Sequence, residues 1–147
     1  MRASTDVTTG AYTKAQFIRH ANAICKRSHR QIKMYYERYA KEQKPGTSDE
    51  DVYAGAMQAL IIPGIQFEFD YIRALGGPKG EERDVEDLVG TMQYAIETGQ
   101  RSSTINTFED LREQFADYNR LVRRYGINRC LIDRVPFAEL DRRQSGT

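Results

Sequence analysis

A stretch without glycine or proline runs from Thr13 to Lys44 and constrains the fold of this chain more than any other feature. Apolar and small residues recur there every three or four positions, which places them on one face of a helix. Thr13 and Gln16 have the spacing of a capping box, and Pro45 lacks the amide hydrogen that a continuing helix needs. The pattern predicts a helix that ends near Gln43. The residues of its apolar face are Phe17, Ala21, Ile24, Cys25, Ser28, Ile32, Tyr35 and Tyr39.

A second helix is expected to follow, with Thr47 or Ser48 as its N-cap and three acidic residues in its first turn, where the helix dipole favours negative charge. Pro63 and Gly64 must break or kink this helix near Ile62. The run Gly76-Gly77-Pro78 then ends it.

Two further helices complete the pattern. The third begins between Gly80 and Glu82 and runs to about Thr98, and the fourth is capped by Thr107 and ends before Gly126. No stretch alternates between apolar and polar residues for long enough to predict a sheet.

Four amphipathic helices joined by short loops predict an all-α fold, an antiparallel four-helix bundle with a kinked second helix. The 147 residues are enough for one domain with its own core. We expect a disordered linker over residues 1–12, the bundle over residues 13–140, and a flexible tail over residues 141–147. A short helical turn is possible at residues 137–140.

Cys25 and Cys130 are the two cysteines of the chain and allow three readings. In an up-and-down bundle the end of the fourth helix lies near the start of the first, so a disulfide is the favoured reading. It would close a loop of roughly 100 residues and stabilise the fold by about 4–5 kcal/mol, and it would indicate an oxidising compartment. Two buried free thiols are the second reading. A metal site with His29 and His20 is the third, although zinc needs a fourth well-placed ligand.

Short motifs along the chain resemble a loosely defined group of small secreted or lipid-anchored helical proteins of actinobacteria. They are the segment from Phe17-Ile18 to Ala21-Asn22-Ala23-Ile24-Cys25, the central Pro63, the stop Leu75-Gly76-Gly77-Pro78, and Tyr125-Gly126-Ile127-Asn128-Arg129-Cys130. The first helix departs from that group in being unusually basic, and the chain has no lipobox cysteine. The resemblance implies export and the disulfide, but no activity.

No residue pattern in the chain predicts catalysis, a cofactor or a metal. His20 and His29 lie at opposite edges of the apolar face of the first helix, and both are expected at the surface or at its boundary. Neither has a glutamate three positions before it, as di-iron bundles require. No haem-attachment, phosphate-loop or calcium-loop motif is present. The acidic run Glu81, Glu82, Asp84, Glu86 and Asp87 is expected to be a solvated helix start.

Charge is segregated along the chain, although the net charge is only +1. Residues 13–44 carry nine basic side chains against two acidic ones, whereas residues 45–111 carry thirteen acidic against four basic. The favoured interpretation is a set of exposed helix faces that pair with acidic neighbours. The alternative is a surface for an anionic partner. Its residues would be Lys26, Arg27, Arg30, Lys33, Arg38, Lys41, Arg123, Arg124 and Arg129.

These observations give three expectations for function. The first is a non-enzymatic, exported helical binding or accessory protein of the cell envelope, whose partner is a protein or an anionic envelope polymer. The second is a cytosolic protein that binds nucleic acid, which is less favoured because such domains usually have a pI above about 9 and this one has a pI of about 7.8. The third is a carrier with a cavity lined by tyrosines, of which the chain has nine. No signal segment and no apolar run of membrane-spanning length is found in the sequence.

Overall fold

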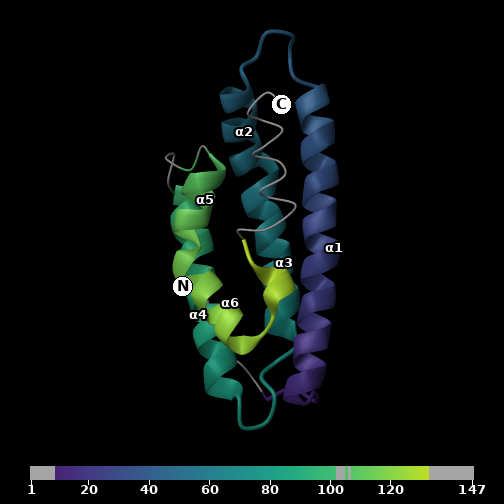
Figure 1. Cartoon of the computed structure of the whole chain (residues 1–147), viewed down its shortest axis with the longest axis vertical. Coiled ribbons are helices and arrows are strands. Elements are labelled where there is room, and N and C mark those ends of the chain that lie inside the picture. The colour runs from purple at the N-terminus through teal and green to yellow at the C-terminus, as the bar shows by residue number, and fades with distance from the viewer. Residues whose placement is uncertain (1–8, 102–104, 106, 133–147) are drawn as a thin grey trace.

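The computed structural model describes residues 9–101, 105 and 107–132, and these residues form four antiparallel rods, as predicted (Figure 1). The first rod is α1 (Lys14–Lys41), and the second contains α2 (Asp49–Ala56), η1 (Met57–Ile61) and α3 (Ile62–Ala74). The third is α4 (Glu82–Arg101). The fourth contains α5 (Phe108–Gln114) and α6 (Ala116–Tyr125), and the short helix η2 (Asn128–Cys130) follows it.

The ends of α1 are close to where the sequence places them. Thr13 accepts a hydrogen bond from the backbone of Gln16, whose side chain accepts one from the backbone of Thr13, so the capping box is confirmed. The helix ends at Lys41, two residues before the predicted Gln43. The loop that follows passes through Gly46, which has φ of +90°, a conformation that suits glycine.

The second rod is kinked but not broken at its proline. Ser48 caps α2 by accepting a hydrogen bond from the backbone of Asp51. The chain then forms a wide π-helical turn, in which the backbone of Ile62 donates to the carbonyl of Met57. Pro63 is therefore placed in the first turn of α3, where its missing amide hydrogen costs least. The π turn is how the helix accommodates the proline and continues.

The fourth rod differs from the single helix predicted between Thr107 and Gly126. Thr107 forms a capping box with Asp110, as its position suggests. At Phe115, however, φ of −103° and ψ of 16° leave the helical region, and the rod divides into α5 and α6. The Phe115 side chain at the break is fully buried, and its ring packs edge-on against the ring of Tyr118, with centres 6.1 Å apart. Gly126 ends α6 in the left-handed conformation, as expected.

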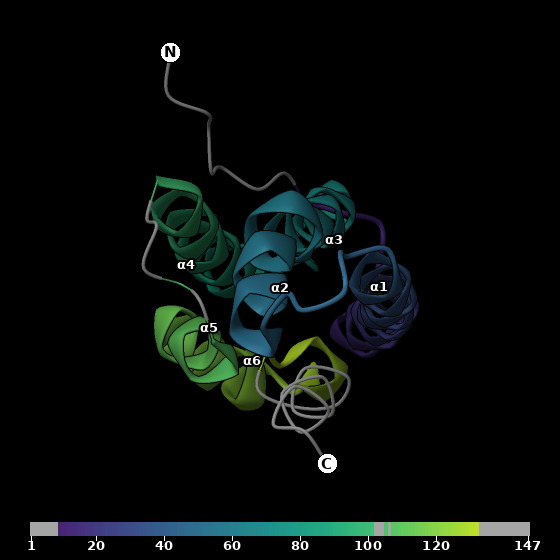
Figure 2. The same ribbon diagram turned by 90° about the horizontal axis from the view of Figure 1, so that it is seen from above.

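The buried apolar residues of the four rods form one core. Seen end on, the segment after α6 returns to lie against α1 (Figure 2). The disulfide between Cys25 and Cys130 fastens that segment, with Cα atoms 5.0 Å apart and both residues fully buried. The backbone amide of Arg129 also donates to the side-chain oxygen of Asn22 at 3.0 Å. The favoured reading of the two cysteines is thus confirmed, and the free thiols and the cysteine-metal site are excluded.

The chain on either side of the bundle contributes to its packing. Gly10 donates a backbone hydrogen bond of 2.9 Å to Gly77, so the last residues of the expected linker lie against the α3–α4 loop. The backbone amide of Ile132 donates at 2.8 Å to the buried side chain of Asn119, which holds the segment after η2 in the core. Residues 1–8 and 133–147, which include the expected turn at 137–140 and the expected tail, lie outside the described residues.

Glycine allows α1 and α3 to come close together. A Cβ atom built on Gly64 would lie 2.6 Å from Cγ1 of Ile32 in α1, which is closer than real Cβ atoms approach other atoms. Gly90, within α4, is different, because a Cβ atom built there has no other atom within 4 Å. The two glycines therefore predict opposite effects of the same substitution.

Substituting Gly64→Ala should lower the free energy of unfolding by roughly 1–3 kcal/mol, because the added methyl group forces Ile32 and the two helices apart. Gly90→Ala is the matched control, and it should raise the free energy of unfolding by up to about 1 kcal/mol, since alanine favours a helix more than glycine does. Urea denaturation followed by circular dichroism measures both values. Equal effects of the two substitutions would contradict the close approach at Gly64.

Candidate functional site

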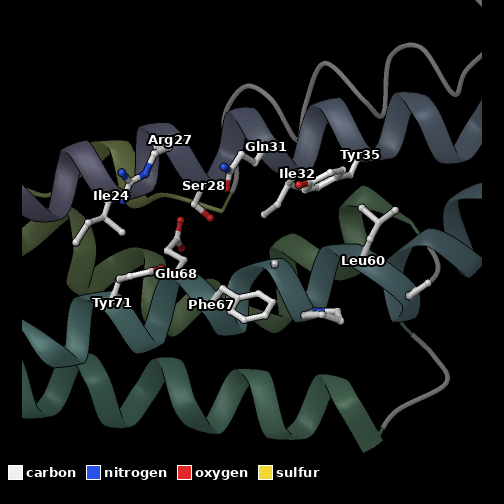
Figure 3. Close-up of a pocket in the computed structure, with 13 residues that line it drawn as sticks. Ile24, Arg27, Ser28, Gln31, Ile32, Tyr35, Leu60, Phe67, Glu68 and Tyr71 are labelled. Atoms are coloured by element: carbon white, nitrogen blue, oxygen red, sulfur yellow. The ribbon is translucent and has the colours of Figure 1, made fainter.

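A groove of about 400 Å³ lies between α1 and the second rod, along the π turn and most of α3 (Figure 3). Its walls are mainly apolar and come from both helices. Pro63 and Gly64 form part of the wall on the second rod, so the kink and the close helix contact both shape the groove. The other residues that line it are Ile24, Arg27, Ser28, Gln31, Ile32, Tyr35, Ala59, Leu60, Phe67, Glu68 and Tyr71.

Three aromatic side chains in this groove remain exposed to solvent. Phe67 is 67% exposed, and Tyr35 and Tyr71 are each about half exposed. Tyr35 comes from α1, and the other two come from α3 (Figure 3). Large apolar side chains that gather around a hollow, and do not scatter over the surface, are typical of a binding site.

A buried acid–base pair lies next to the groove. Glu68, on α3, has no exposed surface, and its Oε1 lies 2.7 Å from Nε2 of His29 on α1. The second carboxylate oxygen, Oε2, has no hydrogen-bond partner among the described residues. Figure 3 shows the Glu68 side chain extending from α3 toward Ser28 on α1, at the groove. The groove therefore combines apolar walls with one buried carboxylate, of which the oxygen Oε2 has no hydrogen-bond partner among the described residues.

The expectation that His29 is a surface or boundary residue is wrong, because the side chain is only 4% exposed. The physical reason is Glu68, which supplies a partner for the imidazole inside the bundle and so offsets the cost of burying it. No spacing within α1 could reveal this partner, since it lies 39 positions away on another helix. The other histidine, His20, is half-buried and contacts the ring of Tyr12, with ring centres 4.3 Å apart.

Tyr118 on α6 is a further buried polar residue of the core. Burial raises the pKa of its hydroxyl well above the usual value, and the negative charge of Glu68 raises it further. The hydroxyl has no hydrogen-bond partner among the described residues. Burial likewise raises the pKa of Tyr125 to about 12, with the charges of Glu81 and Asp84 as smaller causes.

The tyrosines as a group divide between core and surface. Tyr36, Tyr53, Tyr118 and Tyr125 pack in the core, which accounts for much of the tyrosine content. Two tyrosines line the groove, as described above, and Tyr94 on α4 is exposed away from it. Tyr12 and Tyr39 are partly buried and pack against the core as well, so packing accounts for six of the nine tyrosines. A ligand-facing role remains for Tyr35 and Tyr71.

The basic residues predicted to bind a partner lie on three elements. Those of α1 point away from its buried face and are exposed, apart from the half-buried Lys33. Arg129 is exposed on η2 beside α1, whereas Arg124 on α6 shares a small hollow with Asp84 and Asp87 of α4. Arg27 alone of the nine lines the groove. The others are Lys26, Arg30, Lys33, Arg38, Lys41 and Arg123.

Ion pairs between the basic face of α1 and the acidic helices are not seen for five of its residues. Besides His29–Glu68, the ion pairs of the described residues include Arg101 with Glu97, Arg112 with Glu109 and Arg120 with Asp117, each within one helix. Of the six α1 residues predicted to bind a partner, the five without such a pair are Lys26, Arg27, Arg30, Arg38 and Lys41.

The acidic run lies at the N-terminus of α4, with Glu82 and Asp84 in the first turn of the helix. Glu82 accepts hydrogen bonds from the backbone amide of Gly80 at 2.9 Å and from the hydroxyl of Thr9 at 3.1 Å. Hydrogen bonds to its carboxylate, foremost from its own backbone amide, lower its pKa. Within residues 9–101, 105 and 107–132, no group of three or more His, Cys, Asp or Glu side chains is placed to hold a metal ion.

Comparisons of the chain with protein-family models, with curated proteins and with solved structures found no match. Of the helices that the structure describes, none has both the length and the apolar character needed to cross a membrane.

Tyr118→Phe should leave the free energy of unfolding at neutral pH unchanged or raise it by about 1 kcal/mol, because it removes a buried hydroxyl without a partner. Above a pH of about 10 the wild type should lose stability, since unfolding releases a proton that the folded protein holds to a higher pH. The Tyr118→Phe variant should lose less stability than the wild type over the same pH range. Chemical denaturation at a series of pH values measures both effects.

The matched control is Tyr94→Phe, because Tyr94 is 69% exposed. It should follow the wild type at every pH. A marked loss of stability in Tyr118→Phe at neutral pH would show that the hydroxyl has a partner and would contradict the interpretation.

Proposed function

We propose that this chain is an exported, non-enzymatic helical protein that binds a small, largely apolar ligand in the groove between α1 and α3. The observation that carries the proposal is the groove itself, in which exposed aromatic rings surround an apolar hollow of about 400 Å³. Pockets for small molecules usually have volumes of about 300–1,000 Å³ and walls that are mainly apolar. The carrier hypothesis therefore has a specific location in the fold.

Export rests on the disulfide and on the sequence resemblance. Buried disulfides such as Cys25–Cys130 are typical of oxidising compartments and rare in the cytosol of most organisms. The motifs shared with small secreted helical proteins of actinobacteria agree with that compartment. A role as an accessory protein of the cell envelope is part of this proposal.

Binding of an anionic polymer or nucleic acid is the weaker candidate. The nine basic residues are spread over α1, α6 and η2, and Arg124 lies close to acidic side chains. Arg27 is the residue of this set that also lines the groove, where it can contribute to ligand binding. The geometry thus favours a small ligand over a long anionic partner.

The proposal predicts saturable binding of the neutral indole alcohol tryptophol. The chain contains no tryptophan, so indole fluorescence excited beyond the tyrosine absorption comes from the probe alone. The emission should shift to the blue as the indole ring leaves water. Phe67→Ala should weaken binding by roughly tenfold, as expected for removing an aromatic contact.

Tyr94→Ala is the matched control, because it removes an equally exposed aromatic ring from a site outside the groove. It should bind tryptophol as the wild type does. Both substitutions remove exposed side chains and should leave the circular dichroism spectrum unchanged. The absence of saturable binding, or equal weakening by the two substitutions, would refute the groove as the binding site.

A further inference from the structure

We infer that the groove selects an amphipathic organic cation, whose ammonium group donates a hydrogen bond to Glu68 while its apolar body lies against the aromatic side chains. This inference rests on the proposed function and specifies the chemistry of the ligand. Four observations carry it: the open acceptor on Glu68, the burial of that carboxylate, the aromatic rings of the groove, and the position of Arg27.

The first observation is that Oε2 of Glu68 accepts no hydrogen bond from the described residues. A carboxylate has two oxygens with about four acceptor positions. His29 approaches Oε1 at 2.7 Å, but Oε2 has no partner among the described residues. Buried polar groups nearly always have a partner, and the exceptions call for an explanation. A donor supplied from the groove would complete the coordination of Glu68.

The second observation is that Glu68 has no exposed surface although it belongs to the groove lining. A carboxylate shielded from water interacts more strongly with a positive charge than an exposed one does. A neutral hydroxyl would fill the acceptor without compensating the negative charge, and an anionic group would be repelled. The buried carboxylate thus favours an ammonium group over both.

The third observation is the set of aromatic rings that line the same groove as the carboxylate. Tyr71 and Phe67 lie on the same helix as Glu68, and Tyr35 faces them from α1 (Figure 3). The faces of aromatic rings attract cations and also pack against apolar groups. A molecule with one positive end and one apolar or aromatic end suits both parts of the groove.

The positively charged side chain of Arg27 and the contact of His29 with Glu68 determine how the ligand is oriented in the groove. Arg27 is exposed and belongs to the groove lining, and its guanidinium group would repel an ammonium group placed beside it. His29 is already in contact with Oε1. The positive end of the ligand therefore lies at the Oε2 side of Glu68 and away from Arg27. Ser28 and Gln31 on α1 can supply further hydrogen bonds to polar atoms of the ligand.

The test compares tryptamine with tryptophol, which differ only in having an ammonium or a hydroxyl group at the same position. Indole-3-propionate is the anionic probe. Titrations of the full chain followed by indole fluorescence should give tryptamine a dissociation constant roughly tenfold below that of tryptophol, as expected for a charge-assisted hydrogen bond. Indole-3-propionate should bind most weakly.

Glu68→Gln should reduce the preference for tryptamine over tryptophol to about one, because it removes the charge and keeps the size of the side chain. Asp70→Asn is the matched control: it removes an exposed carboxylate two positions away on the same helix, and it should keep the preference. Phe67→Ala is a second variant for the same titrations, and it should fold because the Phe67 side chain is largely exposed. It should weaken both probes to a similar extent and leave the preference intact.

The outcomes separate the two proposals. Saturable binding of both probes with equal affinity overturns the choice of a cation and leaves the groove as a ligand site. A lack of binding by every probe overturns the proposed function as well. A preference for tryptamine that survives in Glu68→Gln, or tighter binding of indole-3-propionate, overturns the role of Glu68.

Discussion

The packing of α1 against α3 is the contact on which the rest of this structure depends. Gly64 lets the two helices approach until a side chain at that position would overlap with Ile32. This approach brings His29 and Glu68 within 2.7 Å of each other inside the bundle. The groove lies in the same interface, beside the contact. One pair of helices therefore provides core packing, a buried acid–base pair and a hollow that is open to solvent.

The helix kink and the disulfide both stabilise the packing of α1 against α3. The π turn at Met57–Ile61 allows the second rod to continue through Pro63, and the wider turn places Ala59 and Leu60 in the groove wall. Short π segments inside α-helices are often found at functional sites. The disulfide at Cys25 lies four residues from His29, on the same buried face of α1. It restrains the part of α1 that carries the pair.

Much of the fold could be predicted from the sequence because its signals are local. Capping by Thr13, Ser48 and Thr107 depends on residues three positions apart, and the end of α6 depends on one glycine. The disulfide followed from the order of the helices. The division at Phe115 could not be predicted, because Leu111, Phe115 and Tyr118 keep the spacing of an unbroken helix.

The candidate site was harder to predict for the same reason. Tyr35 and Ile32 were assigned to the apolar face of the first helix, but nothing in that segment shows which residues face a groove. The sequence of α1 predicts His29 at the surface or its boundary, because its partner, Glu68, is in another helix. Glu68 itself stands between two aromatic residues in a pattern typical of a helix with one exposed charge. Only the packing of α1 on α3 distinguishes it from the other acidic residues.

If the buried carboxylate of Glu68 serves ligand binding, as proposed, the bundle should fold without the His29–Glu68 pair. The most direct measurement is the free energy of unfolding of the double variant His29→Leu/Glu68→Met, which replaces the pair with apolar side chains of similar size. Such replacements of buried pairs are often neutral or stabilising by about 1–4 kcal/mol. We predict a free energy of unfolding equal to or above that of the wild type. A loss of several kcal/mol would contradict the claim and identify the pair as a structural element of the bundle.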